Sequence, residues 1–221
     1  MLPVTPSFHV IVECIAFLAA VLFGRYGGRY FLLFIPFLLY TCINEYIGCY
    51  YKYVLHERNC FLYNIYTPVE FVFYSLLIRH ALNSRLRKKL TLSFVVAGLG
   101  FSLYNMLFIQ GLNQGLNTYT NVTLSLLLIF ASLLYLYDLL IISERIQTPV
   151  REPMFWIVAG LLFFNFGWLA INALYRCAIA FHFTLFGKEI YSQIMKLLNL
   201  LMYSCFTISF VLCYRNRKST C

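Results

Sequence analysis

Long apolar runs separated by short polar connections dominate the chain. Each run holds roughly 18 to 25 residues, enough for a helix to cross the hydrocarbon core of a bilayer, which is about 30 Å thick. The runs are continuous and lack the alternation of apolar and polar positions that marks a membrane-spanning strand. The pattern predicts an all-α bundle of seven transmembrane helices, at about 7–24, 30–54, 61–81, 90–110, 121–142, 154–175 and 190–214.

The connections between these runs are too short to fold as domains. The longest polar ones, 111–120 and 143–153, fall far below the about 50 residues of a small domain. The start of the chain, residues 1–8, carries no Lys or Arg, unlike the basic start of a secretory signal peptide, so the first run is expected to remain as a helix. We therefore expect a single transmembrane domain over residues 1–221 and no soluble domain.

Composition fits a membrane-embedded bundle. Of the 221 residues, 62% are hydrophobic and 11% are charged, whereas about a quarter of a soluble domain is charged. Many of the 18 Tyr and 22 Phe lie near predicted helix ends, where aromatic rings favour the bilayer interface. The net charge of +9 sits in short clusters between apolar runs, so the lipid bilayer is an expected partner and nucleic acid is not.

Positive charges are distributed unevenly between the two sets of connections. The connections after the first, third, fifth and seventh runs hold twelve Lys and Arg, and the others hold four. Positive residues near helix ends are retained in the cytoplasm, so the N-terminus is predicted outside and the C-terminus inside. The same bias in every connection favours an odd number of helices.

The most basic segment lies on the predicted inner side, between the third and fourth runs. It contains no acidic residue, and each cation would attract anionic lipid headgroups by about 1 kcal/mol. An acidic surface of a cytoplasmic partner is an equal candidate, and topology alone also accounts for the charge. The residues are Arg79, Arg85, Arg87, Lys88 and Lys89.

Ionisable residues inside the predicted spans point to a site, because a charge at the bilayer centre costs at least about 2.5 kcal/mol. They lie in the outer half or at the midplane, and polar residues accompany them at helical spacing, as in the stripe Tyr63, Tyr66, Glu70 and Tyr74. Lipid offers no hydrogen-bond partners, so the stripes should face the bundle interior. The predicted ligand or ion cavity comprises Glu13, Glu45, Asn64, Glu70, Asn165, Asn172, Lys196 and Asn199.

Two interpretations of these polar groups stay open. In the first, Glu70 and Lys196, with Glu45 or Glu13, contact a ligand or relay protons. In the second, they pair with one another and with Tyr and Asn side chains to hold the helices together. Pro68 frees a backbone carbonyl and predicts a kink beside Glu70, which favours the first interpretation.

Motifs for catalysis, metal binding and cofactor binding are missing from the sequence. It has no HExxH, no acidic pair at metal-ligand spacing, no GxSxG and no Gly-rich phosphate loop. Ser192 stands one turn before Lys196, where a retinal protein would carry a carboxylate. We therefore expect no enzymatic activity, no metal and no cofactor. Cys60 and Cys177 fall near predicted outer helix ends, where a disulfide is permitted, although unpaired thiols are favoured.

The third run carries a resemblance to a group of bacterial membrane proteins. It reads Tyr63-Asn64-Ile65-Tyr66-Thr67-Pro68-Val69-Glu70-Phe71-Val72-Phe73-Tyr74-Ser75. This segment, with the overall size and helix number, resembles small seven-helix membrane proteins of Bacteroidetes bacteria, whose genes often neighbour those of sensor histidine kinases. The resemblance implies a bacterial inner membrane and a signalling partner, and it supplies no active site.

Two functions are compatible with these observations. The first is a non-enzymatic receptor or sensor that couples an outer-half polar cavity to a cytoplasmic or membrane signalling protein. The alternative is a small transporter or ion-coupled permease, because residues 65–70 faintly echo residues 190–196, as a 3+1+3 helix plan would produce. Homo-oligomerisation is left open.

The charge bias predicts the direction of insertion. Green fluorescent protein fused after Cys221 should fluoresce, because it folds in the cytoplasm, and alkaline phosphatase at the same place should be inactive. Fusions within the 56–59 connection should give the opposite pair of signals. An active phosphatase at the C-terminus would contradict the predicted orientation.

Overall fold

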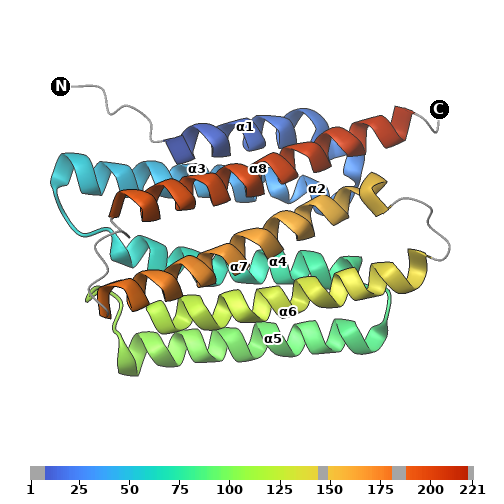
Figure 1. Cartoon of the computed structure of the whole chain (residues 1–221). Helices are drawn as coiled ribbons and strands as arrows, with labels where there is room; N and C mark the ends of the chain where they lie inside the picture. Colours follow the sequence, from blue (N-terminus) through green and yellow to red (C-terminus); the bar gives the residue numbers. More distant parts are fainter. Residues whose placement is uncertain (1–7, 144–148, 181–187, 219–221) are drawn as a thin grey trace.

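A computed structural model describes residues 8–143, 149–180 and 188–218 of the chain, and every regular element in these ranges is helical (Figure 1). The short η1 and η4 are 3₁₀ turns, and η2 and η3 are π-helical turns that end long helices. The elements are α1 Phe8–Phe23, η1 Gly24–Gly27, α2 Arg29–Leu32, α3 Phe34–Tyr50, η2 Tyr51–Leu55, α4 Cys60–Ala81, α5 Arg85–Tyr104, η3 Asn105–Ile109, α6 Thr118–Ser143, η4 Pro149–Arg151, α7 Pro153–Ala180 and α8 Lys188–Lys218.

Seven of the described helical segments are long and apolar enough to cross a membrane. Each overlaps one of the predicted runs, so the prediction of an all-α bundle with seven transmembrane helices is confirmed. The chain has the architecture of a multi-pass membrane protein, and its direction of insertion stays a prediction. The spans are Val10–Gly27, Arg29–Leu55, Cys60–Ala81, Arg85–Ile109, Thr118–Ile141, Pro153–Leu174 and Ile190–Lys218.

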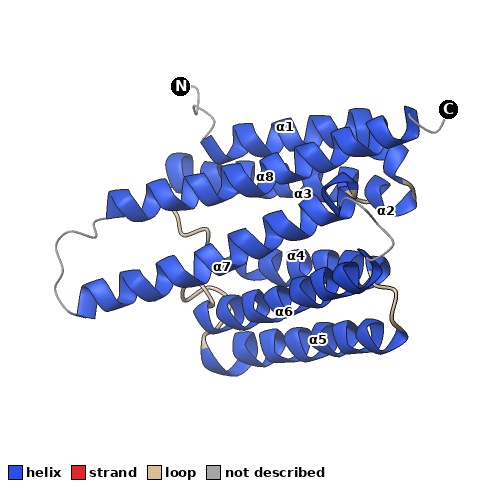
Figure 2. Cartoon of the chain, turned by 45° about the vertical axis from the view of Figure 1, so that its right-hand side comes forward, coloured by secondary structure: helices blue, strands red, loops and turns tan. Residues whose placement is uncertain are grey.

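The helices form a ring that follows chain order, with one span outside it. α1 packs against α3 and α8, α8 against α7, α7 against α6, and α6 against α4, which also meets α3. The fourth span, α5, packs against α4 and α6 at the edge of the bundle, as both views show (Figures 1 and 2). α1 begins at the end of the bundle opposite to the end of α8 (Figure 1). The ring encloses an interior to which six of the spans contribute.

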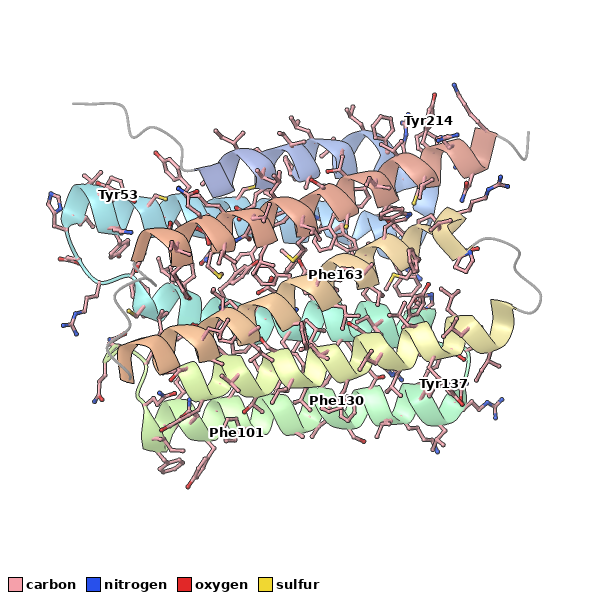
Figure 3. All side chains as sticks on the ribbon, viewed as in Figure 1. Tyr53, Phe101, Phe130, Tyr137, Phe163 and Tyr214 are labelled. Atoms are coloured by element: carbon pink, nitrogen blue, oxygen red, sulfur yellow. The ribbon has the colours of Figure 1, made fainter. Side chains whose placement is uncertain are left out.

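Exposed aromatic side chains are placed along the bundle as expected for a protein in a bilayer. Tyr53 lies near one end, and Tyr137 and Tyr214 lie near the other (Figure 3). Phe130 and Phe163 lie between them and are exposed. Tyrosine favours the headgroup region because its hydroxyl needs water, whereas phenylalanine tolerates the hydrocarbon core. The surface therefore carries tyrosines at its ends and apolar rings in the middle.

An aromatic cluster fills the half of the ring that the charge bias predicts to be inner. Phe34 of α3 packs against Phe206 and Phe210 of α8, with ring centroids 5.7 and 5.4 Å apart, and against Phe73 of α4 at 5.1 Å. Phe34, Phe206 and Phe210 are fully buried. Edge-to-face pairs of this kind contribute about 0.5–1.5 kcal/mol each. The cluster joins three helices that are distant in the sequence.

Glycines permit the closest helix contacts. A Cβ atom on Gly160 of α7 would lie 2.9 Å from Cβ of Cys205 and 3.2 Å from the backbone oxygen of Met202, both on α8. A Cβ atom on Gly98 would lie 2.7 Å from the Phe71 ring, where α5 meets α4. Small residues let helix backbones approach in a membrane, where packing rather than water exclusion drives association. α7 and α8 therefore pack closely against each other.

An ion pair fixes the inner connection between α4 and α5. Asp138 of α6 is 3% exposed and bonds to Arg87 at 2.8 Å, and the backbone N–H of Asn83 donates to the same carboxylate. The Arg87 guanidinium also lies over the Tyr137 ring, 5.2 Å from its centroid. Arg87, predicted as a docking residue, is thus committed to an internal contact.

The other predicted docking residues differ in exposure. Arg85 and Lys89 are exposed, whereas Arg79 and Lys88 are half-buried. The exposed pair keeps its charges at the surface of the predicted inner end, where lipid headgroups or a partner would meet them.

Asn64 holds the outer connection between the fourth and fifth spans in place by hydrogen bonds. Its amide nitrogen donates to the backbone oxygens of Leu112 and Gly115, each at 2.8 Å, and its amide oxygen accepts from the N–H of Asn117 at 2.9 Å. Asn64 is 2% exposed. Its side chain therefore satisfies three backbone groups of a connection that has no regular structure of its own.

Replacing Asn64 with Leu should destabilise the outer connection. The change leaves three backbone groups without partners, each at a cost of about 1–3 kcal/mol if water cannot reach it. We expect a lower midpoint of thermal unfolding in detergent and faster proteolysis within 110–117. Asn113→Leu, at an exposed position of the same connection, is the control and should change neither. Equal effects of both substitutions would contradict the anchoring role of Asn64.

Candidate functional site

A cavity of about 390 Å³ lies inside the helix ring. Side chains from α1, α3, α4, α6, α7 and α8 line it. Leu116 and Thr118, at one end of the cavity, belong to the outer connection and the start of α6, whereas Tyr74 and Tyr203 lie at its deeper end. The cavity therefore occupies the half of the bundle that the charge bias places outside.

A packed aromatic layer separates the cavity from the inner end of the bundle. The ring of Phe206 contacts the lining residues Tyr74 and Tyr203, with centroid distances of 5.8 and 5.6 Å. Beyond it, Phe34 and Phe210 are fully buried. The described part of the bundle is thus hollow in its outer half and packed in its inner half.

Glu13 is the most enclosed carboxyl group of the cavity. It lies on α1 and is 3% exposed, and the Tyr203 hydroxyl of α8 is near enough to interact with it. Its Oε2 atom is buried and has no hydrogen-bond partner. A buried polar atom without a partner is unfavourable unless something else fills that role. Glu13 therefore offers a free acceptor to the cavity.

Glu70 lies on α4, on the same face as two other polar residues. The hydroxyl of Tyr66, one turn earlier, lies near its carboxyl group, and that hydroxyl is hydrogen-bonded to the Thr41 hydroxyl of α3 at 2.9 Å. Thr41 in turn donates to the backbone oxygen of Phe37. Because the Thr41 hydrogen is used in this way, the Tyr66 hydroxyl donates to Thr41, and the pair links α4 to α3 beside Glu70.

Glu45 provides the third carboxyl group. It lies on α3, and the Tyr63 hydroxyl of α4 donates to its Oε2 at 3.1 Å. The three carboxyl groups are close enough to interact electrostatically, Glu45 with Glu13 and Glu70, and Glu13 with Glu70. A tyrosine of the cavity wall lies near each of them: Tyr203 near Glu13, Tyr63 near Glu45 and Tyr66 near Glu70.

The described lining of the cavity contains no Lys, Arg or His. Lys196, predicted to lie with Glu70, is half-buried on α8 and is not a lining residue, although Met195 and Asn199 of the same helix are. The wall of this cavity therefore does not contain the predicted contact between Glu70 and Lys196. The ion pair that the described residues make, Arg87 with Asp138, lies elsewhere.

The opposite wall, from α7 and α8, is formed by amides and apolar side chains. Asn165, Asn172 and Asn199 each donate to a backbone oxygen one turn earlier in their own helix, at 2.8, 2.7 and 3.0 Å. Asn172 also accepts from the Tyr191 hydroxyl at 3.2 Å, which links α7 to α8 near the outer end. Each of these amide groups keeps a second N–H, and Asn165 and Asn199 also keep an amide oxygen, so this wall offers both donors and acceptors.

The structure brings together most of the predicted cavity residues, and it also shows what the sequence pattern did not reveal. Asn64 faces the outer connection rather than the cavity. Asp138 is a buried acid of the fifth span that was not among the predicted site residues; its place one turn from the predicted inner end was the available signal. Cys60 is a free thiol, and the side chain of Cys177 lies outside the described part, so their pairing stays untested.

Comparison with protein-family models, with curated proteins and with solved structures gave no match to this chain.

Two Tyr→Phe substitutions at the deep end of the cavity should differ in their effect. Tyr203→Phe removes the hydroxyl that interacts with the Glu13 carboxyl and should lower the free energy of unfolding by about 0.5–1.5 kcal/mol. Tyr74→Phe should be close to neutral, because the Tyr74 hydroxyl is buried and has no partner. Thermal unfolding of the two purified variants gives the comparison. A larger loss for Tyr74→Phe would contradict the arrangement described here.

Proposed function

We propose that this protein is a membrane sensor, not an enzyme: a ligand enters the outer-half cavity, and the occupied state alters the inner ends of the helices that a signalling partner contacts. The observation that carries the proposal is the division of the bundle into a hollow outer half and a packed inner half. A pore would need a continuous path, whereas a receptor needs a pocket with a solid connection to its other end.

The helix α8 supplies that connection. It runs for 31 residues without interruption, from the lining residues Tyr191 and Met195 to Arg217 at the predicted inner end. Near that end, Tyr214 packs against Tyr26, with ring centroids 5.1 Å apart, and Arg217 lies over the Tyr26 ring. A shift of α8 at the cavity would therefore move a basic and aromatic surface that also involves the end of α1.

The partner is expected to be an acidic or anionic surface on the cytoplasmic side. Arg85 and Lys89 are exposed on the first turns of α5, and Arg25 and Arg217 are exposed beside the end of α8. An exposed positive set of this kind favours complementary charge on a docking protein. The third span resembles that of proteins encoded beside sensor histidine kinases, and this resemblance also supports a cytoplasmic signalling partner.

Co-purification tests the sensor proposal. The chain is crosslinked in native membranes, extracted gently and analysed by mass spectrometry, and a stoichiometric protein with a cytoplasmic signalling domain is expected. Arg85→Gln with Lys89→Gln should reduce its recovery several-fold, because rim charges contribute to association. Lys52→Gln, exposed near the opposite end, is the matched control and should leave recovery unchanged. Purification of the chain alone would contradict the proposal.

A second candidate function is ion-coupled transport, with Glu70 as the proton or cation site. It is favoured by the positions of the echoed segments: Tyr66 and Glu70 of α4, and Tyr191 and Met195 of α8, all line one cavity. The ring order with α5 outside is also compatible with a 3+1+3 plan. In proteoliposomes, voltage-driven proton or Na⁺ flux that Glu70→Gln abolishes would favour transport over sensing.

A further inference from the structure

We propose that the cavity takes a small organic cation, an amine whose ammonium group meets the carboxyl groups and whose apolar part packs against the aromatic wall. This inference rests on the proposed ligand-binding function and names the class of ligand. It is carried by three features of the cavity: its unpartnered atoms, its charged groups and its size.

The unpartnered atoms of the wall favour a ligand that donates hydrogen bonds. Among the described lining residues, the buried polar atoms without a partner are Oε2 of Glu13, Oδ1 of Asn121 and the hydroxyl of Tyr74. The first two are acceptors, and a hydroxyl accepts as well as donates. Glu13 and Tyr74 are 3% and 1% exposed, so bulk water does not serve them. An ammonium group, with three donors and no acceptor, is complementary to this set.

The carboxyl groups of the wall favour a cation over the other ligand classes. Glu13, Glu45 and Glu70 are the carboxylic acids among the described lining residues, which include no Lys, Arg or His to offset them. An anionic ligand would add a like charge to this cluster, and a neutral one would leave any ionised carboxyl without a counter-charge in a poorly polar medium. A cation interacts favourably with all three carboxyl groups at once.

The dimensions and walls of the cavity favour an organic cation over a bare metal ion. A volume of about 390 Å³ lies within the usual range of pockets for small organic ligands. The described residues include no group of three or more His, Cys, Asp or Glu side chains placed to hold a metal ion. Trp168, Phe164 and Tyr66 line the cavity with aromatic surface, which attracts organic ammonium groups through cation–π contact.

Matched probes test the ligand class directly. The purified full chain in lipid nanodiscs is titrated with phenethylamine, with its neutral analogue 2-phenylethanol and with the anion 3-phenylpropionate, and the midpoint of thermal unfolding is followed. Phenethylamine should raise the midpoint in a saturable way, because a ligand that binds the folded state stabilises it by mass action. The neutral and anionic analogues should give no saturable shift.

Substitutions in the cavity identify the groups responsible. Glu13→Gln and Glu70→Gln should each weaken binding of phenethylamine by about ten- to a hundredfold, the usual value of a charge-assisted hydrogen bond. Glu57→Gln makes the same chemical change at an exposed residue of the outer connection and should leave the affinity unchanged. Size-exclusion profiles of all variants show whether each still folds. If Glu13→Gln fails to fold, Glu70→Gln decides the question.

The outcomes separate the ligand class from the sensor proposal. Equal stabilisation by all three probes, or by 2-phenylethanol alone, would overturn the cationic ligand. So would unchanged affinity for phenethylamine in both Glu→Gln variants, or a saturable shift with NaCl that matches the amine, which would assign the carboxyl groups to an inorganic ion. None of these results affects co-purification with a partner, which depends on the inner surface and tests the sensor proposal on its own.

Discussion

The structure depends on how the bundle accommodates three carboxyl groups without a cation among the described lining residues. Glu13, Glu45 and Glu70 lie on three different helices around one cavity, and a tyrosine hydroxyl lies near each of them. In a medium with few polar groups, such an arrangement is unfavourable, because the acids interact with one another and lose the hydration they would have in water. A protein that needed only to pack seven helices would gain stability from apolar residues at these positions. The cost is understandable if the carboxyl groups serve a ligand.

The inner half of the bundle offsets that cost. Phe34, Phe206 and Phe210 are fully buried, and the close approach of α7 and α8 at Gly160 adds contact that lipid cannot supply. The ion pair of Asp138 with Arg87 fixes the inner connection from outside this core. A rigid inner half also allows a movement at the cavity to reach the inner end of the bundle. A helix that is packed tightly along its length moves as one body. The division between a polar, hollow half and a packed half is therefore the main feature of the fold.

The number and limits of the helices could be predicted because bilayer thickness imposes one length on every span. The site was harder to predict, since helical spacing shows which residues share a face but not how each helix is rotated in the ring. Glu70 and Asn199 face the cavity as their stripes indicate, whereas Lys196, next to the lining residue Met195, does not. Asn64 shares a helix with Glu70, yet its side chain serves the outer connection, a tertiary contact that no periodic pattern encodes. Asp138 escaped notice because its surroundings in the sequence are apolar.

The central claim is that no basic side chain among the described residues compensates the cavity acids, and Lys196 is the residue on which it depends. A double-mutant cycle with Glu70→Gln and Lys196→Met, read as the free energy of unfolding of the wild type, both single variants and the double variant, measures the interaction of these two residues. The account predicts that the two effects add to within about 0.5 kcal/mol, as they do for residues that share no contact. An interaction energy well above about 1 kcal/mol would show that Glu70 and Lys196 form an ion pair, and would contradict a cavity reserved for an external cation.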